Sequence, residues 1–157
     1  FYIEDILSSV TTPKKNLSLK NVENILYACE PPGKKARNVS RAPNYIGYSE
    51  LEAINYFVSN LHTAFPACKE LRFRLHPSNP RLPIDIPNRK LNGIKTSISN
   101  NDLATDISIA DSIVGTNSMV LYIGMLANRI SISAIPPGGH PCTIPDSRIV
   151  DFKTLLV

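Results

Sequence analysis

One turn in this chain of 157 residues combines the residue types that bind anions. Gly115, Thr116, Asn117 and Ser118 follow an expected strand, Ser112 to Val114, and precede an apolar helix from about Met119 to Ala127. Gly115 allows a sharp turn and a close approach of backbone to ligand. Hydroxyls beside helix N-terminal amides donate hydrogen bonds to phosphate oxygens. An ordinary helix cap needs one such residue, so three in a row favour a phosphate site.

A second candidate is the histidine of Arg74-Leu-His-Pro-Ser78. His76 ends an alternating run, Glu70 to Leu75, that predicts a strand, and Pro77 both stops the strand and holds His76 in extended backbone. An imidazole there can donate to a phosphate or act as a general acid that neutralises a departing one. The alternative is a structural or exposed histidine. Arg72 and Arg74 share one face of this strand, either as phosphate ligands or, more commonly, as solvent-facing residues.

A third candidate is the basic loop from Glu30 to Arg37, which follows the apolar run Asn24 to Cys29. Lys34, beside Gly33, could help to clamp a diphosphate or an anionic acceptor, together with the other cations of this loop. A solvated loop is the alternative. No Walker motif, GxGxxG after a strand or GxSxG is present, which weakens the readings as a P-loop NTPase, a dinucleotide-binding domain or a serine hydrolase.

Helices and strands alternate along the chain. Beyond the elements above, a capping-box spacing at Ser49 predicts a helix that ends before Pro66, and Asn101 or Asp102 can cap a helix through Ala110. Further strands are expected near Ile94 to Ile98 and at Ile130 to Ile132. This order predicts an α/β fold with a mostly parallel sheet and helices on both faces. Ligands of such sheets bind beyond the carboxyl ends of the strands, so the three candidate loops would gather on one rim.

Length and composition indicate one domain, at 43% apolar and 19% charged residues. We expect residues 1–20 to be a lead-in or linker, with a short helix before Val10, and residues 21–157 to be the domain. Between Pro31 and Lys95 eleven Lys or Arg residues face four Asp or Glu. This imbalance suits an anionic ligand or a solvated surface. No nucleic acid partner is expected, because aromatic residues make up 7% and Trp is absent.

The three cysteines, Cys29, Cys68 and Cys142, lack the spacing of a disulfide framework or a zinc site. They favour a reducing compartment, so we expect the cytoplasm, either free or at the membrane surface. No apolar run reaches the ~20 residues that span a bilayer, and no transmembrane segment is expected. Because Phe1 begins the chain and no signal sequence follows, we expect an excised or processed product.

The motifs Arg74-Leu-His-Pro77, Asp102-Leu and Ala110-Asp-Ser-Ile-Val-Gly-Thr-Asn-Ser118 together resemble the C-terminal half of GT-B glycosyltransferases. They are most similar to bacterial sialyltransferases and polysialyltransferases, and also to capsule and teichoic-acid transferases. The resemblance covers roughly residues 25–137. It implies a Rossmann-like three-layer domain, one half of a GT-B fold, that binds a nucleotide-activated sugar without a cofactor or metal.

By this resemblance His76 would contact the donor phosphate and help the nucleotide leave, with Pro77 beside it. Thr116, Asn117 and Ser118 would hold the phosphate, although related sequences often carry two adjacent serines where this chain has Asn117-Ser118. A CMP-linked sugar is the favoured donor and a glycan the acceptor. The family's general base lies in an N-terminal domain that nothing here resembles, so this chain would be inactive without that missing domain.

Two alternatives remain open at this point. The first is a glycerol- or ribitol-phosphate transferase domain that uses a CDP-activated donor at the same site. The second is a non-catalytic basic module that binds an anionic glycan or a protein.

Overall fold

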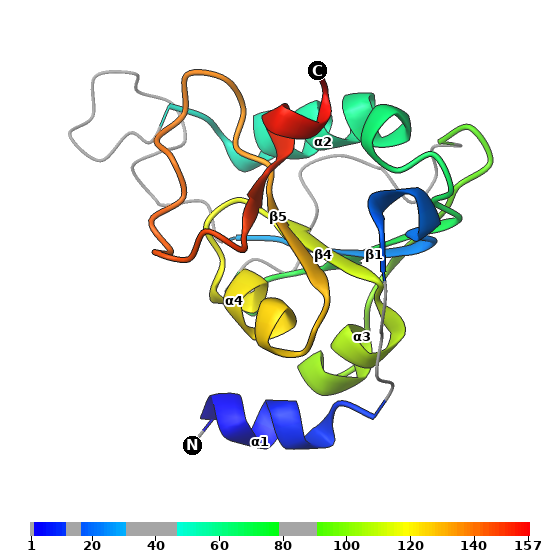
Figure 1. Cartoon of the computed structure of the whole chain (residues 1–157), viewed down its shortest axis with the longest axis vertical. Helices are drawn as coiled ribbons and strands as arrows, with labels where there is room; N and C mark the ends of the chain where they lie inside the picture. The colour runs from blue at the N-terminus through cyan, green and yellow to red at the C-terminus, as the bar shows by residue number, and fades with distance from the viewer. Residues whose placement is uncertain (1, 12–16, 31–46, 79–90) are drawn as a thin grey trace.

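The computed structural model describes residues 2–11, 17–30, 47–78 and 91–157. Six strands and four α-helices are formed within these ranges (Figure 1). The strands are β1 (Asn24–Ala28), β2 (Glu70–Arg74), β3 (Lys95–Ile98), β4 (Ser112–Gly115), β5 (Ile130–Ser133) and β6 (Val150–Asp151). The helices are α1 (Tyr2–Ser9), α2 (Glu50–Ala64), α3 (Leu103–Ile109) and α4 (Met119–Leu126), with 3₁₀ turns η1 (Leu19–Asn21) and η2 (Phe152–Leu155).

The strands form one sheet in the order β3-β2-β1-β4-β5-β6, and every pair of neighbouring strands is parallel. This confirms the predicted α/β, Rossmann-like fold with a mostly parallel sheet. Strand order reverses between β1 and β4, because β2 and β3 lie on one side of β1 and the later strands lie on the other. Such a switch point leaves a crevice outside the carboxyl ends of the two strands, where open α/β sheets bind ligands.

Helices cover both faces of the sheet, and each face has its own apolar core (Figure 1). On one face α2 and η2 pack over aromatic side chains, with the Phe57 ring 5.5 Å from Tyr27 and 5.2 Å from Phe152. On the other face α3 and α4 bury Ile107 and Leu121 completely. Two cores of this kind are what an all-parallel sheet requires, because both of its faces must be shielded from water.

The expected helix caps are present. Ser49 accepts a hydrogen bond from the Glu52 amide at 3.1 Å, the first half of a capping box, and its hydroxyl donates to the Glu52 carboxylate at 3.2 Å. Asp102 caps α3 by accepting from the Thr105 amide at 2.8 Å. Ser118 caps α4 by accepting from the Val120 amide at 3.2 Å. The sequence therefore locates the start of each of these helices within a residue or two.

Helix α4 lies unusually close to the sheet at Gly124. A methyl group at this position would collide with the Ile113 side chain of β4 and would lie 3.2 Å from the hydroxyl of Ser131 in β5. That hydroxyl donates to the Leu121 carbonyl of α4 at 2.6 Å. The missing side chain and this hydrogen bond together fix the height of α4 above the sheet.

Buried charges meet at the amino edge of the sheet, opposite the predicted site. Asp111 precedes β4, and its Oδ2 accepts from the backbone amides of Glu23 and Asn24 at 2.9 and 3.0 Å. Arg129 precedes β5 and is 4% exposed. Its guanidinium donates to four backbone carbonyls at the ends of α3 and α4, those of Ile107, Ser108, Ala110 and Ala127. These two side chains join the strands to the helix ends.

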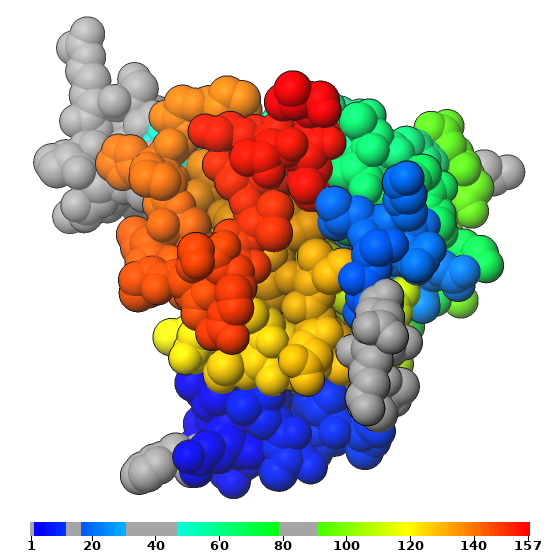
Figure 2. All heavy atoms as spheres, in the orientation of Figure 1, coloured from blue at the N-terminus to red at the C-terminus, as the bar shows by residue number. Residues whose placement is uncertain are grey.

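Helix α1 packs across α3 and α4, with Ile6 buried in the same core (Figure 2). The predicted short helix before Val10 is therefore present, and it belongs to the apolar layer beneath the sheet. The division into a lead-in up to residue 20 and a domain from residue 21 stays a prediction. Within the described ranges no helix is long and apolar enough to cross a bilayer.

Candidate functional site

A pocket of about 390 Å³ opens at the switch point of the sheet. Its walls are the carboxyl ends of β1 and β2, the start of α4, Leu103 of α3 and Tyr2 of α1. We call this cavity the switch-point pocket. All three candidate loops of the sequence contribute to it, since His76, Pro77 and Ser118 line the pocket together with Glu30, the first residue of the third loop. Residues 42 positions apart in the chain thus meet at the rim of the sheet, as the parallel topology requires.

His76 is held in one orientation by the residue two positions on. The Ser78 amide donates to His76 Nδ1 at 3.1 Å, and the Ser78 hydroxyl lies 2.8 Å from the same nitrogen. Because an amide can only donate, Nδ1 is the acceptor, and in the neutral ring the proton resides on Nε2. The imidazole, half-buried in the pocket wall, therefore has its N–H donor on the nitrogen that Ser78 does not use.

Ser118 lies at the start of α4 with one hydrogen-bonding function still unused. Its oxygen accepts from the Val120 amide, while no acceptor for its hydroxyl hydrogen exists among the described residues. The first amides of a helix also lack intrahelical partners, and the helix dipole places positive potential at this end. This combination of a free hydroxyl and helix amides is suited to an anionic oxygen.

Thr116 and Asn117 contact neighbouring loops. Thr116 is 5% exposed. It makes a side-chain hydrogen bond with Tyr48, whose pKa is raised by burial and partly lowered again by this bond. The Asn117 Oδ1 accepts from the Thr143 amide at 2.9 Å and the Thr143 hydroxyl at 3.1 Å. Neither side chain lines the switch-point pocket, and their assignment as phosphate ligands stays a prediction.

Gly115 is the last residue of β4 and has no positive φ. A side chain here would lie 3.1 Å from the Ala28 carbonyl oxygen of β1 and 3.7 Å from Leu121. Tight packing between the two strands of the switch point therefore explains the glycine, in place of the sharp turn that we expected from the sequence. Its role in substrate binding stays a prediction.

Sequence reasoning did not single out Cys29 and Glu30, which line the pocket directly after β1, although Glu30 begins the third candidate loop. Burial raises the pKa of the Glu30 carboxyl. Burial also raises the pKa of the Cys29 thiol, and the nearby Glu50 carboxylate raises it further, so this thiol stays protonated and unreactive. Their position directly after β1 was the available signal, because every residue at the end of a strand next to the switch point faces this rim.

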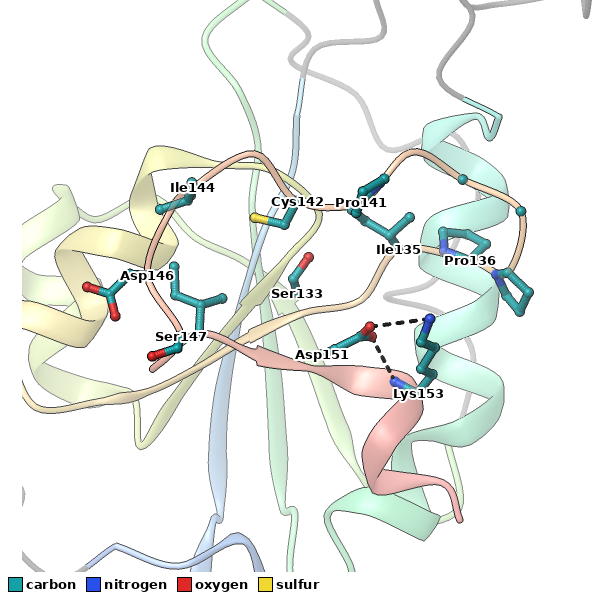
Figure 3. A pocket seen from close by; sticks show the side chains of 14 residues that line it. Ser133, Ile135, Pro136, Pro141, Cys142, Ile144, Asp146, Ser147, Asp151 and Lys153 are labelled. Carbon is teal, nitrogen blue, oxygen red and sulfur yellow. Dashed lines mark hydrogen bonds and ion pairs between the residues drawn. The ribbon is translucent and has the colours of Figure 1, made fainter.

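A second hollow, of about 410 Å³, lies inside the loop that connects β5 to β6 (Figure 3). Both of its carboxylates already have partners. Asp146 accepts two side-chain hydrogen bonds from Arg148, which lower its pKa to about 2, and Asp151 pairs with Lys153 at 3.6 Å. The Asn117–Thr143 bonds tie this loop to the start of α4. The acidic groups of this hollow are therefore already paired with neighbouring cations.

Gly33 and Lys34, with the rest of the basic loop beyond Glu30, lie outside the described residues. Within the ranges described, no group of three or more His, Cys, Asp or Glu side chains could hold a metal ion.

No family model matches the sequence, and no curated protein matches it. Among solved structures the chain is similar to Thermosulfurimonas dismutans KpsC, beta Kdo 2,7 transferase, with a TM-score of 0.53 and 14% identity. It is also similar to the beta Kdo 2,4 transferase of the same KpsC, with a TM-score of 0.52 and 10% identity. The alignments cover 96% of this chain but only 45% and 48% of those chains. The chain thus spans about half the length of these transferases and has the fold of one half of a GT-B glycosyltransferase.

Proposed function

We propose that this chain is the donor-binding domain of a glycosyltransferase, which moves a sugar from a nucleotide-activated donor to a glycan acceptor. The observation that carries this proposal is the meeting of His76, Ser118 and the start of α4 in one pocket at the switch point. The likeness of the fold to two sugar transferases supports the same conclusion. A CMP-linked donor, such as an activated sialic acid, is favoured by the resemblance of the His-Pro and Thr-Asn-Ser motifs to sialyltransferases.

The chemistry would be a substitution at the anomeric carbon of the donor. An acceptor hydroxyl forms a bond to this carbon, and the bond to the phosphate oxygen breaks, with its electron pair leaving on the nucleotide. The Nε2–H of His76 would donate to the departing phosphate, and Ser118 with the α4 amides would bind its other oxygens. Donors placed in advance where charge develops contribute a few kcal/mol each to transition-state stability. The general base would come from a separate N-terminal domain.

Two other readings make different predictions for binding. A glycerol- or ribitol-phosphate transferase would use the same pocket for a CDP-linked donor. A non-catalytic basic module would bind polyanions without preference for a nucleotide, through cations most of which lie outside the described residues. The pocket favours the transferase readings, because its polar groups converge on one cavity.

The experiment is isothermal titration of the chain with CMP, CDP, UDP and GDP at two salt concentrations. Selective binding of CMP, lost in His76→Ala and Ser118→Ala, supports sugar transfer from a CMP-linked donor, whereas preference for CDP supports polyol-phosphate transfer. Equal binding of all four that fades with salt supports the basic module. Arg148→Ala is the matched control, since this exposed side chain pairs with Asp146 away from the pocket.

A further inference from the structure

Arg74, the last residue of β2, is a wall residue of the switch-point pocket with a half-used guanidinium. Within the described ranges only its Nη1 is engaged, donating to the Asn101 carbonyl at 2.8 Å and to Asp106 Oδ2 at 2.9 Å. Among the described residues nothing accepts from Nε or Nη2. Nε–H and Nη2–H form one edge of the planar guanidinium, and this edge matches the two oxygens of a phosphate or carboxylate.

Asp106 of α3 fixes the position of Arg74. Its side chain is fully buried, and its carboxylate also accepts from the Ser99 hydroxyl at 2.6 Å and from the side-chain Nδ2 of Asn101 at 3.2 Å. A buried carboxylate with three donors around it cannot move easily, because each donor would lose its acceptor. Arg74 is therefore restrained at one nitrogen while the opposite edge of its guanidinium remains available.

We propose that Arg74 is a second anion-binding residue of the switch-point pocket, with Asp106 as the residue that positions it. The ligand would be a pair of anionic oxygens on the activated donor, either of its phosphate or of a sugar carboxylate. This assignment rests on the proposed function. It also gives a reason why the two arginines of β2 differ. Arg72 pairs with Glu70 of its own strand at 2.9 Å, whereas Arg74 pairs with Asp106 of α3 and lines the pocket.

The test compares the affinities of cytidine, CMP and CMP-sialic acid in Arg74→Gln, Arg74→Lys and Asp106→Asn. Arg74→Gln should lower CMP affinity about 10- to 100-fold, the range of a charge-assisted hydrogen bond, and leave cytidine affinity unchanged. Arg74→Lys should recover part of the loss, and Asp106→Asn should reduce the CMP-to-cytidine ratio several-fold. Arg72→Gln is the matched control and should leave this ratio unchanged. If Arg74→Gln loses affinity for CMP-sialic acid alone, the Nε–Nη2 edge of Arg74 binds the sugar carboxylate. If it loses affinity equally for CMP, this edge binds the phosphate.

Loss of Arg74 leaves a buried carboxylate with one donor fewer, so Arg74→Gln could fail to fold. The double variant Arg74→Gln/Asp106→Asn removes both charges and keeps the binding comparison possible. Equal losses for cytidine and CMP, or no loss for CMP and CMP-sialic acid, would overturn the assignment while leaving the proposed function in place.

Failure of the proposed function is recognised separately, by a wild-type chain that binds no nucleotide. In that case Arg74 is tested with inorganic phosphate, through the NMR signal of its Nε–Hε group, assigned by its disappearance in Arg74→Lys. A saturable shift supports an anion site at Arg74, and a signal that stays unchanged overturns it.

Discussion

The two edges of the sheet both gather polar side chains, but they use them in opposite ways. At the amino edge Arg129 and Asp111 are buried and turn their hydrogen-bonding groups onto backbone amides and carbonyls. At the carboxyl edge His76, Arg74 and Ser118 each keep at least one donor that no described residue uses. Satisfied polar groups stabilise a fold, and unsatisfied donors beside a cavity prepare it for a ligand. Arginine therefore serves structure at one edge, while at the other edge its remaining donors are available to the ligand that we propose.

The largest change in the free energy of unfolding is expected for Arg129→Leu, which tests the structural role of the amino edge. This change leaves four helix-end carbonyls without their donor, and it should lower the free energy of unfolding by about 3–5 kcal/mol. Urea denaturation measures the loss. Arg148→Leu, which removes an exposed cation, should cost less than about 0.5 kcal/mol. Equal losses in both variants would mean that the amino edge is not the structural one.

Ser118 allows the structural and binding roles of one residue to be separated. Ser118→Asp keeps a good helix cap, so the free energy of unfolding should be unchanged. Its carboxylate would repel a phosphate bound about 4 Å away by roughly 2–4 kcal/mol. Ser118→Ala should lose about 1 kcal/mol of stability through the missing cap. Thermal unfolding and CMP titration on both variants check this. Unimpaired CMP binding by Ser118→Asp would place the anion elsewhere.

His76→Ala should change ligand binding without changing the fold. Among the described residues the half-buried ring hydrogen-bonds only to Ser78 of its own turn, so we expect its loss to change the free energy of unfolding by less than about 0.5 kcal/mol. The loss of the Nε2–H donor should cost about 1.4 kcal/mol in nucleotide affinity, or tenfold. In an assay with the complete enzyme, a larger loss in kcat than in donor affinity would identify His76 as catalytic, and equal losses would limit it to binding.

Glu30→Gln gives the smallest effect on stability, and the size of this effect depends on pH. Burial raises the pKa of this carboxyl in the folded state, so the stability linked to its protonation is fully present below the ordinary pKa of a glutamate. That stability is lost as pH rises through the raised value. Glu30→Gln should therefore match the wild type near pH 4 and melt at a higher temperature near pH 7. A melting temperature that falls relative to wild type with rising pH would contradict this.

Local sequence patterns predicted most of the fold, because each of them involves residues that lie close together in the chain. The caps at Ser49, Asp102 and Ser118 and the apolar periodicity of the helices locate their elements within a residue or two. Strand β6 was missed, since two paired residues, Val150 and Asp151, are too short for any alternation to show.

The site could be predicted only in part. His76 and Ser118 were found because a strand end and a helix start are visible in the sequence, and topology then brings them together. The half-used guanidinium of Arg74 depends on Asp106, 32 residues away. The bonds of Asn117 depend on Thr143, across a loop without periodicity. Such pairings arise from tertiary packing, and no spacing rule along the chain reports them.

The width of the switch-point pocket is set by a residue that does not line it. Gly124 brings α4 against β4, and the first residues of α4 form one wall of the cavity, while His76 forms another. An alanine at Gly124 would lift the helix by the thickness of a methyl group and carry Ser118 outward with it. The distance between the His76 imidazole and the Ser118 hydroxyl thus depends on how α4 packs on the core. A search restricted to chemically reactive residues would overlook Gly124, on which this packing depends.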